Sequence, residues 1–150
     1  MDLIAITESG APAEPLPSTP EIATEAVQAM TQLYRAVAYE PPWIGYLAIE
    51  NGGYVGICGF KSPPRDNRVE IAYFTFPEYE SRGIATRMAA ELILMAHNAV
   101  PALVVAAQTL PEENASTSIL KKLQFRLVGT VDHPEDGLVW EWQLSNAPAA

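Results

Sequence analysis

The chain has 150 residues, the size of one ordinary domain, and we expect a single domain over residues 1–150. Hydrophobic residues make up 49% and charged residues 18%, which is enough apolar material for a core and argues against a disordered chain. The 18 acidic residues against 9 lysines and arginines give a formal charge of -9. Such a surface repels phosphate backbones, so we expect no nucleic-acid partner.

The composition also argues against metal sites and membrane segments. One cysteine forms neither an intramolecular disulfide nor a multi-cysteine zinc site, and the two histidines lie far apart, so no metal is expected. The N-terminal segment has an acid at Asp2 and no basic region, unlike a signal peptide. The longest mostly apolar run, Met88 to Leu94, contains Glu91 and is too short to cross a bilayer. We therefore expect a cytoplasmic protein without a membrane partner.

The first expected elements are a strand and a loop. Leu3 to Thr7 is predicted as a short strand. Ser9 to Pro20 is rich in Pro, Ala and Ser and is predicted as a loop, so residues 1–18 are partly loop.

A helix is expected next. Thr19 is suited to cap it with Pro20 at the first helical position, and Ser18-x-x-Glu21 offers an alternative capping box. The helix ends near Tyr39, because Glu40-Pro41-Pro42 does not continue it. Apolar residues at helical spacing give this helix one buried face: Ile22, Ala26, Met30, Leu33 and Val37.

Three strands should follow. Trp43 to Glu50 and Tyr54 to Phe60 flank Asn51-Gly52-Gly53, a strong hairpin signal. Lys61 to Arg68 is a polar loop containing prolines, and Val69 to Phe76 is a β-branched and aromatic strand.

The C-terminal half is expected to alternate helices and strands. Gly83 to about Asn98 is predicted as an amphipathic helix, and the apolar run Ala102 to Ala107 as a strand buried on both faces. Asn114 to Leu123 is a short helix. Phe125 to Val131 and Leu138 to Leu144 form a closing hairpin.

Residues 145–150 are expected to be a tail. The resulting order is β, α, β, β, β, α, β, α, β, β, which is neither a strict βαβ alternation nor all-β. A mixed α+β fold, with a mixed sheet and helices packed on its faces, is the expected solution.

The most informative stretch is a strand that runs through a short loop into a helix beginning near Gly83. The first-turn amides of such a helix have no intrahelical partner, so they favour an anion such as a pyrophosphate. Gly83 and Ala85 would let a ligand approach the backbone, and Arg82 would add a charged contact. The alternative interpretation is an ordinary loop with a capping glycine.

Three motifs in this order resemble a known family. Ser81-Arg82-Gly83-Ile84-Ala85-Thr86 resembles the acetyl-CoA pyrophosphate loop of the GNAT N-acetyltransferase superfamily, whose pattern is Gln/Arg-x-x-Gly-x-Gly/Ala. Residues 109–125 resemble the Asn-Ala-Ser…Leu-x-Lys-x-Gly-Phe helix of the branch that contains the ribosomal-protein N-terminal acetyltransferases. Residues 134–142 are similar to that branch's final hairpin. The resemblance covers roughly residues 43–144.

Two positions depart from the family pattern. Glu80 stands where Gln or Arg is usual, which brings a carboxylate close to the expected phosphates and is expected to lower cofactor affinity. Gln124 stands where the family has glycine before Phe, so the turn after the last helix is open to a difference.

The resemblance implies a splayed pair of central parallel strands, here 69–76 and 102–107, in a mostly antiparallel sheet. Acetyl-CoA would lie in the gap between these strands, and a substrate amine would attack its thioester directly. Main-chain groups near Phe74 and Phe76 would pair with the pantetheine, while Asn114 and Ser116 would face its thiol end. The pyrophosphate would be held by Ser81, Arg82, Gly83, Ile84, Ala85 and Thr86.

The resemblance also suggests catalytic residues. Many relatives protonate the departing thiolate with a tyrosine on the last helix, but this chain has no tyrosine after Tyr79. Ser116 matches the serine that replaces it in the branch named above, with an ordinary first-turn serine as the alternative. Glu70, at the start of its strand, is the candidate base, acting directly or through water, with a solvated strand-edge carboxylate as the alternative.

The expected partner is a primary amine, either a protein N-terminal α-amine or a small molecule, and the protein is expected to be a monomer or a homodimer. Acidic residues in two loops, Glu112-Glu113 and Glu135-Asp136, are either solvated or help to attract a cationic amine. The alternative to an enzyme is a degenerate GNAT domain that binds CoA or a protein partner without turnover.

Overall fold

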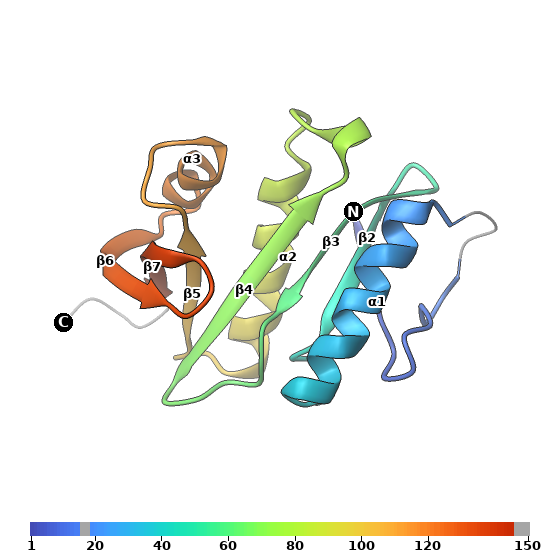
Figure 1. The fold of residues 1–150 in the computed structure, drawn as a ribbon, viewed down its shortest axis with the longest axis horizontal. Helices are drawn as coiled ribbons and strands as arrows, with labels where there is room; N and C mark the ends of the chain where they lie inside the picture. Colours follow the sequence, from blue (N-terminus) through green and yellow to red (C-terminus); the bar gives the residue numbers. More distant parts are fainter. Residues whose placement is uncertain (16–18, 146–150) are drawn as a thin grey trace.

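A computed structural model describes residues 1–15 and 19–145 of the chain. It contains seven strands, three α-helices and one short 3-10 helix in the order expected from the sequence (Figure 1). These elements are β1 (Asp2–Ala5), α1 (Glu21–Ala36), β2 (Gly45–Glu50), β3 (Gly53–Phe60), β4 (Arg68–Thr75), η1 (Pro77–Tyr79), α2 (Ile84–Ala99), β5 (Val104–Thr109), α3 (Ala115–Lys122), β6 (Arg126–His133) and β7 (Gly137–Ser145).

The strands form one mixed sheet in the order β1-β2-β3-β4-β5-β7-β6. Every neighbouring pair is antiparallel except β4 and β5, which are parallel. Their pairing is confined to Arg68–Glu70 against Val104–Ala106, and beyond these residues the two strands separate. The predicted mixed fold and its splayed parallel pair are therefore confirmed.

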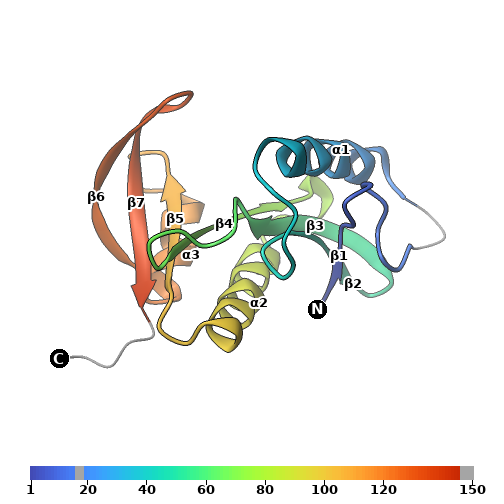
Figure 2. The same cartoon turned by 90° about the horizontal axis from the view of Figure 1, so that it is seen from below.

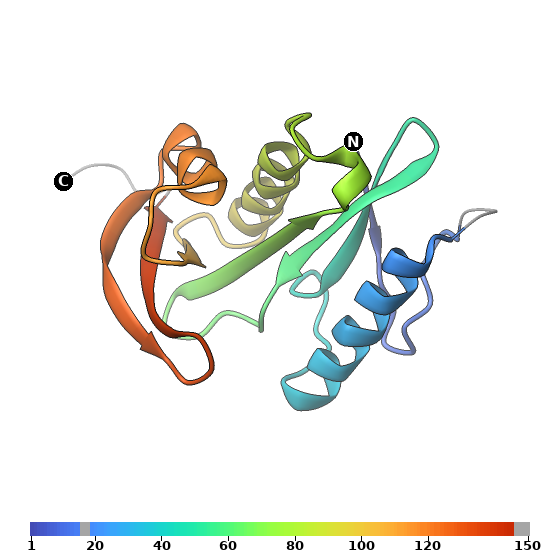
Figure 3. The ribbon, with the colours of Figure 1, turned by 45° about the horizontal axis from the view of Figure 1, so that its top comes forward.

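Helices cover both faces of the sheet (Figures 2 and 3). A Cβ added to Gly45 of β2 would meet the Met30 side chain of α1, whereas one added to Gly56 of β3 would meet Met88 of α2. These close approaches place α1 and α2 on opposite faces, as expected. Within the ranges 1–15 and 19–145, no helix is both long and apolar enough to cross a membrane.

The start and end of α1 differ from the expectation. Its N-cap is Pro20 rather than Thr19, and no side chain caps it, while Ser18 of the alternative capping box lies outside the described residues. The helix ends at Ala36, three residues before Tyr39, whose ring instead packs edge-on against Tyr34 with centroids 5.1 Å apart. Tyr39 therefore lies beyond the end of the helix, and its ring packs against the ring of Tyr34.

The expected turn between β2 and β3 is confirmed, because Asn51 and Gly52 both have positive φ angles, 52° and 79°. Other element boundaries moved by one or two residues, which is the usual scatter at strand and helix ends. Ser145 belongs to β7, and the rest of the expected tail, residues 146–150, lies outside the described residues.

The turn after α3 has a backbone conformation that favours glycine. Gln124 has a φ of 71°, in the left-handed region that glycine favours and other residues rarely adopt. Gln124 thus occupies a position that a glycine would adopt at a lower conformational cost.

Candidate active site

The site begins where β4 and β5 separate, and two backbone hydrogen bonds show which main-chain groups of β4 face the gap. Lys61 N donates to Glu70 O and Phe76 N donates to Val55 O, each at 2.9 Å, so these residues of β4 bond to β3. Because main-chain groups alternate along a strand, Phe74 bonds to β3 as well. The main-chain groups that face the gap are those of Tyr73 and Thr75.

The two phenylalanines named by the sequence analysis differ in their surroundings. Phe74 is 49% exposed and lines a cavity at the open end of the gap between β4 and β5. Phe76 is 2% exposed and does not line that cavity, and its carbonyl accepts a hydrogen bond from Tyr79 N at 2.8 Å. The structure therefore brings the Phe74 side chain to the site and keeps the Phe76 side chain in the core, while the main-chain groups of Phe74 and the amide of Phe76 bond to β3 and not toward the gap.

A cavity of about 580 Å³ opens at this end of the gap, and we call it the mouth cavity. It is enclosed by the end of β4, the loop after η1 and the first turns of α2 and α3. Its lining residues are Tyr73, Phe74, Thr75, Tyr79, Glu80, Ser81, Gly83, Ile84, Ala85, Thr86, Ala115, Ser116, Ser118 and Ile119.

The first turn of α2 presents free amides to the mouth cavity. Gly83 is the N-cap with a φ of 76°, and Arg87 N donates to Gly83 O at 3.1 Å. The amides of Ile84, Ala85 and Thr86 precede that bond and have no acceptor within the helix. Backbone donors and the positive end of the helix dipole thus meet in a cavity that suits an anion.

The charged side chains near this turn do not reinforce the anion site. The Arg82 guanidinium carbon lies 5.6 Å from the centre of the Tyr79 ring, and Arg82 does not line the cavity. Arg87 donates to both carboxylate oxygens of Glu50, at 2.7 and 2.9 Å. Glu80 does line the cavity, and it is the single charged side chain among the described lining residues.

The two candidate residues of α3 have different positions. Ser116 lines the mouth cavity and also a smaller cavity of about 120 Å³ inside the gap, which we call the gap cavity. Asn114 caps the helix: its side chain accepts from Thr117 N at 3.1 Å, while Thr117 Oγ1 accepts from Asn114 N at 2.9 Å. The structure brings Ser116 to the gap and occupies Asn114 in a capping box.

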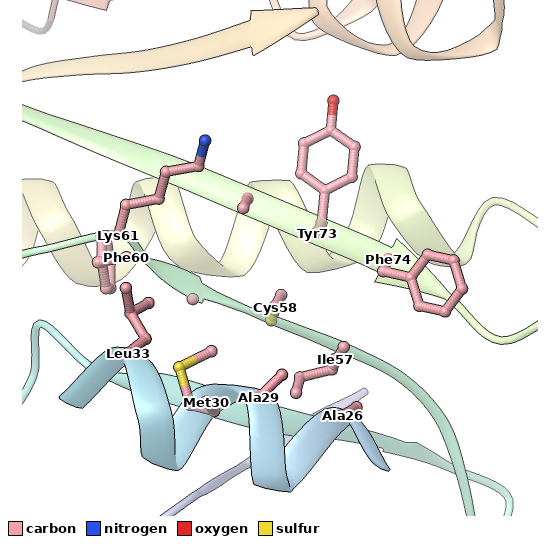
Figure 4. A pocket seen from close by; sticks show the side chains of 12 residues that line it. Ala26, Ala29, Met30, Leu33, Ile57, Cys58, Phe60, Lys61, Tyr73 and Phe74 are labelled. Carbon is pink, nitrogen blue, oxygen red and sulfur yellow. The ribbon is translucent and has the colours of Figure 1, made fainter. Parts of the chain in front are cut away.

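Tyr73 is a site residue that the sequence analysis missed. It lines the mouth cavity and the gap cavity, and it rises from β4 on the side away from α1 (Figure 4). Burial raises the pKa of its hydroxyl to about 12, so this group stays protonated at neutral pH. The signal was available in the strand alternation, which puts Tyr73 on the face opposite to Phe74.

Glu70 lies at the last residue pair before β4 and β5 separate, opposite Ala106. Its carboxylate is 2.6 Å from Lys61 Nζ and 3.5 Å from Arg68 Nη2, and its side chain is 13% exposed. It lines neither the mouth cavity nor the gap cavity, although Lys61 lines the gap cavity. The candidate base is thus held in an ion cluster beside the gap.

Arg68 connects this cluster to β7. It donates to both oxygens of Glu141, through Nε at 3.2 Å and Nη2 at 2.5 Å. Gln108 and Gln143 donate to the same carboxylate at 3.1 and 2.7 Å. Burial alone would raise the pKa of Glu141, but these hydrogen bonds and the Arg68 charge lower it. The network joins β4, β5 and β7 at the closed end of the gap.

The site fits an acyl-CoA in two respects. Free amides at the first turn of α2 suit a pyrophosphate, and the unpaired edge of β4 at Tyr73 and Thr75 suits an amide-bearing arm in the gap. Glu80 is the feature that fits least, because its carboxylate shares the cavity with the expected phosphates.

Solved structures show the same fold. RimL, a ribosomal L7/L12 α-N-protein acetyltransferase, has a TM-score of 0.70 at 16% identity, covering 95% of this chain and 91% of its own. A ribosomal-protein-alanine N-acetyltransferase from Brucella melitensis has a TM-score of 0.63 at 18% identity, covering 81% and 78%. The yncA protein of Salmonella typhimurium, solved with acetyl-CoA as its cofactor, has a TM-score of 0.61 at 18% identity, covering 89% and 77%.

Sequence comparison establishes the family. No curated protein matches the chain. A model of the acetyltransferase (GNAT) domain matches residues 5–126, which is most of the chain. This protein therefore belongs to the acetyltransferase (GNAT) family.

Proposed function

We propose that this enzyme transfers the acetyl group of acetyl-CoA to a primary amine, either the α-amine of a protein N-terminus or that of a small molecule. The observation that carries the proposal is the mouth cavity, in which the free amides of α2 and the first turn of α3 meet the open edge of β4. This arrangement offers an anion site and a channel for an extended acyl arm in one continuous space.

Backbone groups do most of the proposed cofactor binding. Amides at Gly83, Ile84, Ala85 and Thr86 hold the pyrophosphate, with the Ser81 hydroxyl beside them. Main-chain groups of Tyr73 and Thr75 pair with the pantetheine. Arg82 stays a candidate contact only if its side chain leaves the Tyr79 ring.

Acetyl-CoA, when bound, supplies an activated thioester: the amine nitrogen bonds to the acetyl carbon as the carbon–sulfur bond breaks, the nitrogen loses a proton and the sulfur gains one. Ser116 is the proposed donor to the sulfur, because it lines both the mouth cavity and the gap cavity. Tyr73 is the second candidate, because it lines the same two cavities and keeps its proton.

The proton of the amine passes to Glu70, directly or through water, in this proposal. Glu70 is paired with Lys61 and Arg68 in the ion cluster beside the gap. A lysine amine with a pKa near ~10.4 loses a proton at pH 7 at a cost of roughly 4–5 kcal/mol, whereas an α-amine near ~7.8 needs about 1 kcal/mol. An enzyme without a strong base therefore favours α-amines, and RimL, which has the same fold, is an α-N-protein acetyltransferase.

A second candidate function is a degenerate domain that binds CoA or a protein partner without turnover. The observation that favours it is Glu80, whose carboxylate lines the mouth cavity without a lysine or arginine among the other described lining residues. To bind CoA, the backbone N–H donors of α2 must then overcome the repulsion between the Glu80 carboxylate and the phosphates.

A thermal-shift titration with acetyl-CoA, free CoA and ATP tests both candidates. A ligand at 100 times its Kd stabilises the fold by about 2.7 kcal/mol, which is easily measured as a rise in Tm. We expect a rise with acetyl-CoA and CoA and none with ATP, followed by acetylation in a panel of amines. CoA binding without turnover of any amine would favour the degenerate domain, and no rise at millimolar CoA would overturn the cofactor assignment. Light scattering on the same samples distinguishes a monomer from a homodimer.

A further inference from the structure

A second cavity lies on the face of the sheet that α1 covers, and we call it the α1 groove (Figure 4). Its volume is about 270 Å³. The helix contributes Ala26, Ala29, Met30 and Leu33, and the sheet contributes Ile57, Cys58, Gly59, Phe60, Lys61, Ala72, Tyr73 and Phe74. The small side chains of Ala26 and Ala29 on the helix leave room for the groove, and large apolar side chains of the helix and the sheet form its walls.

The groove is almost entirely apolar. Of the described residues that line it, Lys61 alone carries a charge, and its ammonium is paired with Glu70 at 2.6 Å. No carboxylate faces the groove among the same residues, although the chain as a whole has a formal charge of -9. A cation entering the groove would lose its hydration without gaining a partner. The groove therefore suits an apolar group and disfavours a second positive charge.

The groove lies next to the reaction site, and the two share lining residues of β4. Phe74 and Tyr73 line both the groove and the mouth cavity. Lys61, Ala72 and Tyr73 line both the groove and the small cavity inside the gap. An amine that reaches the gap from the α1 face thus has its neighbouring substituent beside the groove.

We infer that the acceptor is a primary amine with an apolar side chain next to the amine, and that the α1 groove binds this side chain. The inference rests on the proposed function, because it assigns the acceptor for that reaction. The volume is sufficient: about 150 Å³ of apolar cavity is enough to bind benzene. A side chain of the size of Leu, Met or Phe therefore fits, whereas a polycationic acceptor does not match the lining.

The acidic residues of the loops at Glu113 and Asp136 do not give the α1 groove a preference for a cationic acceptor. Glu113 pairs with Lys121 at 2.7 Å, and Asp136 lies 3.5 Å from His133 Nδ1. Neither carboxylate lines the α1 groove. The expectation that these loops help to attract a cationic amine thus receives no support at the groove itself.

The test is a binding titration on the CoA-loaded protein by isothermal calorimetry, combined with steady-state kinetics. The probes are phenethylamine, a tripeptide amide with N-terminal Phe, and two polycations, spermidine and kanamycin. The groove variant is Ala29→Leu, which fills the space with a residue that favours helix. The matched control is Ala36→Leu, an equal change on the same helix at an exposed residue that lines no part of the groove.

We expect the two apolar amines to bind and to be acetylated at least tenfold more efficiently than the polycations. Ala29→Leu should raise KM for the apolar amines at least tenfold and leave the CoA-induced Tm shift unchanged, while Ala36→Leu changes neither. The preferred arm, phenethylamine or peptide, identifies whether the amine comes from a small molecule or an N-terminus. Equal or better use of the polycations, no binding of either apolar amine to the CoA-loaded protein, or an unchanged KM in Ala29→Leu would overturn the inference. Loss of CoA binding in the parent protein would instead refute the proposed function.

Discussion

Tyr73 of β4 and Ser116 of α3 line the same two cavities, one at the mouth of the gap and one inside it. Tyr73 lies on β4, and Ser116 lies on α3, which follows β5. The two strands separate after their short parallel pairing, and the two side chains meet across the resulting gap. Both hydroxyls keep their protons at neutral pH, because serine does not titrate in water and burial raises the pKa of Tyr73 to about 12. In the proposed reaction, both hydroxyls are therefore candidate proton donors to the departing thiolate.

Substitution separates these two donors. We expect Ser116→Ala to lower kcat by about 10²-fold, the usual contribution of a positioned acid, with an unchanged Kd for CoA. Tyr73→Phe should lower kcat by less than about tenfold, because it removes a hydroxyl that the reaction does not need. The reverse order of effects would transfer the donor role to Tyr73. In that case the kcat profile of the parent should show no alkaline limb below about pH 11, since the donor titrates near 12.

Removing the carboxylate of Glu80 should strengthen cofactor binding. Because Glu80 is exposed, its repulsion of a phosphate about 4 Å away is close to the value in water, about 1 kcal/mol, so Glu80→Gln should lower the Kd for CoA roughly fivefold. High salt should shrink the effect by screening. The matched control is Glu78→Gln, two residues earlier, where the exposed side chain does not line the mouth cavity. Calorimetry measures both, and an equal change in the two variants would show that only the net charge matters.

Arg68 should contribute to stability through its paired carboxylates. Arg68→Met leaves the Glu141 carboxylate, which is 11% exposed, without its cation and should lower the free energy of unfolding by about 2–4 kcal/mol. Arg65→Met, at an exposed arginine three residues earlier, should change it by less than about 0.5 kcal/mol. Urea unfolding followed by circular dichroism provides the comparison. Similar losses in both variants would contradict a structural role for the network.

The same network makes stability depend on pH. The pKa of Glu141 is lower in the folded protein than in the unfolded chain, so the folded state binds fewer protons. This contribution is present above the unfolded value of about 4.3 and is lost as pH falls through the lower folded pKa. We therefore expect the Tm difference between the parent and Glu141→Gln to shrink as pH falls below about 5. A difference that stays constant over this range would show that Glu141 does not titrate with folding.

The turn after α3 predicts a stabilising substitution. Gln124 holds a φ of 71°, which costs a residue with a Cβ about 1–2 kcal/mol relative to glycine. Gln124→Gly should raise the free energy of unfolding by about 0.5–1 kcal/mol after the larger chain entropy of glycine is subtracted. Gln28→Gly, inside α1, should lower it by about 1 kcal/mol. Thermal unfolding of the two variants is expected to show shifts of opposite sign.

Local sequence signals predicted the elements well, because they depend on neighbours along the chain. The Asn51-Gly52 turn, the strand into Phe74 and the glycine before α2 all follow from backbone preferences that tertiary contacts did not override. The start of α1 was mispredicted because the local preference did not decide it. Thr19 is a good cap in isolation, but the helix begins one residue later than expected and has no side-chain cap.

The sequence by itself determined the order of elements, the family resemblance and the loop at Gly83 that leads into α2, since these depend on residue types and short spacings. Only the tertiary structure decided that Tyr73 joins Ser116 at the gap, that Glu70 is held by Lys61 and Arg68, and that an apolar groove lies under α1. Each of these depends on strand parity and on which face a distant element covers. Contacts between residues far apart in the chain are set by packing of the whole sheet, so no local pattern specifies them.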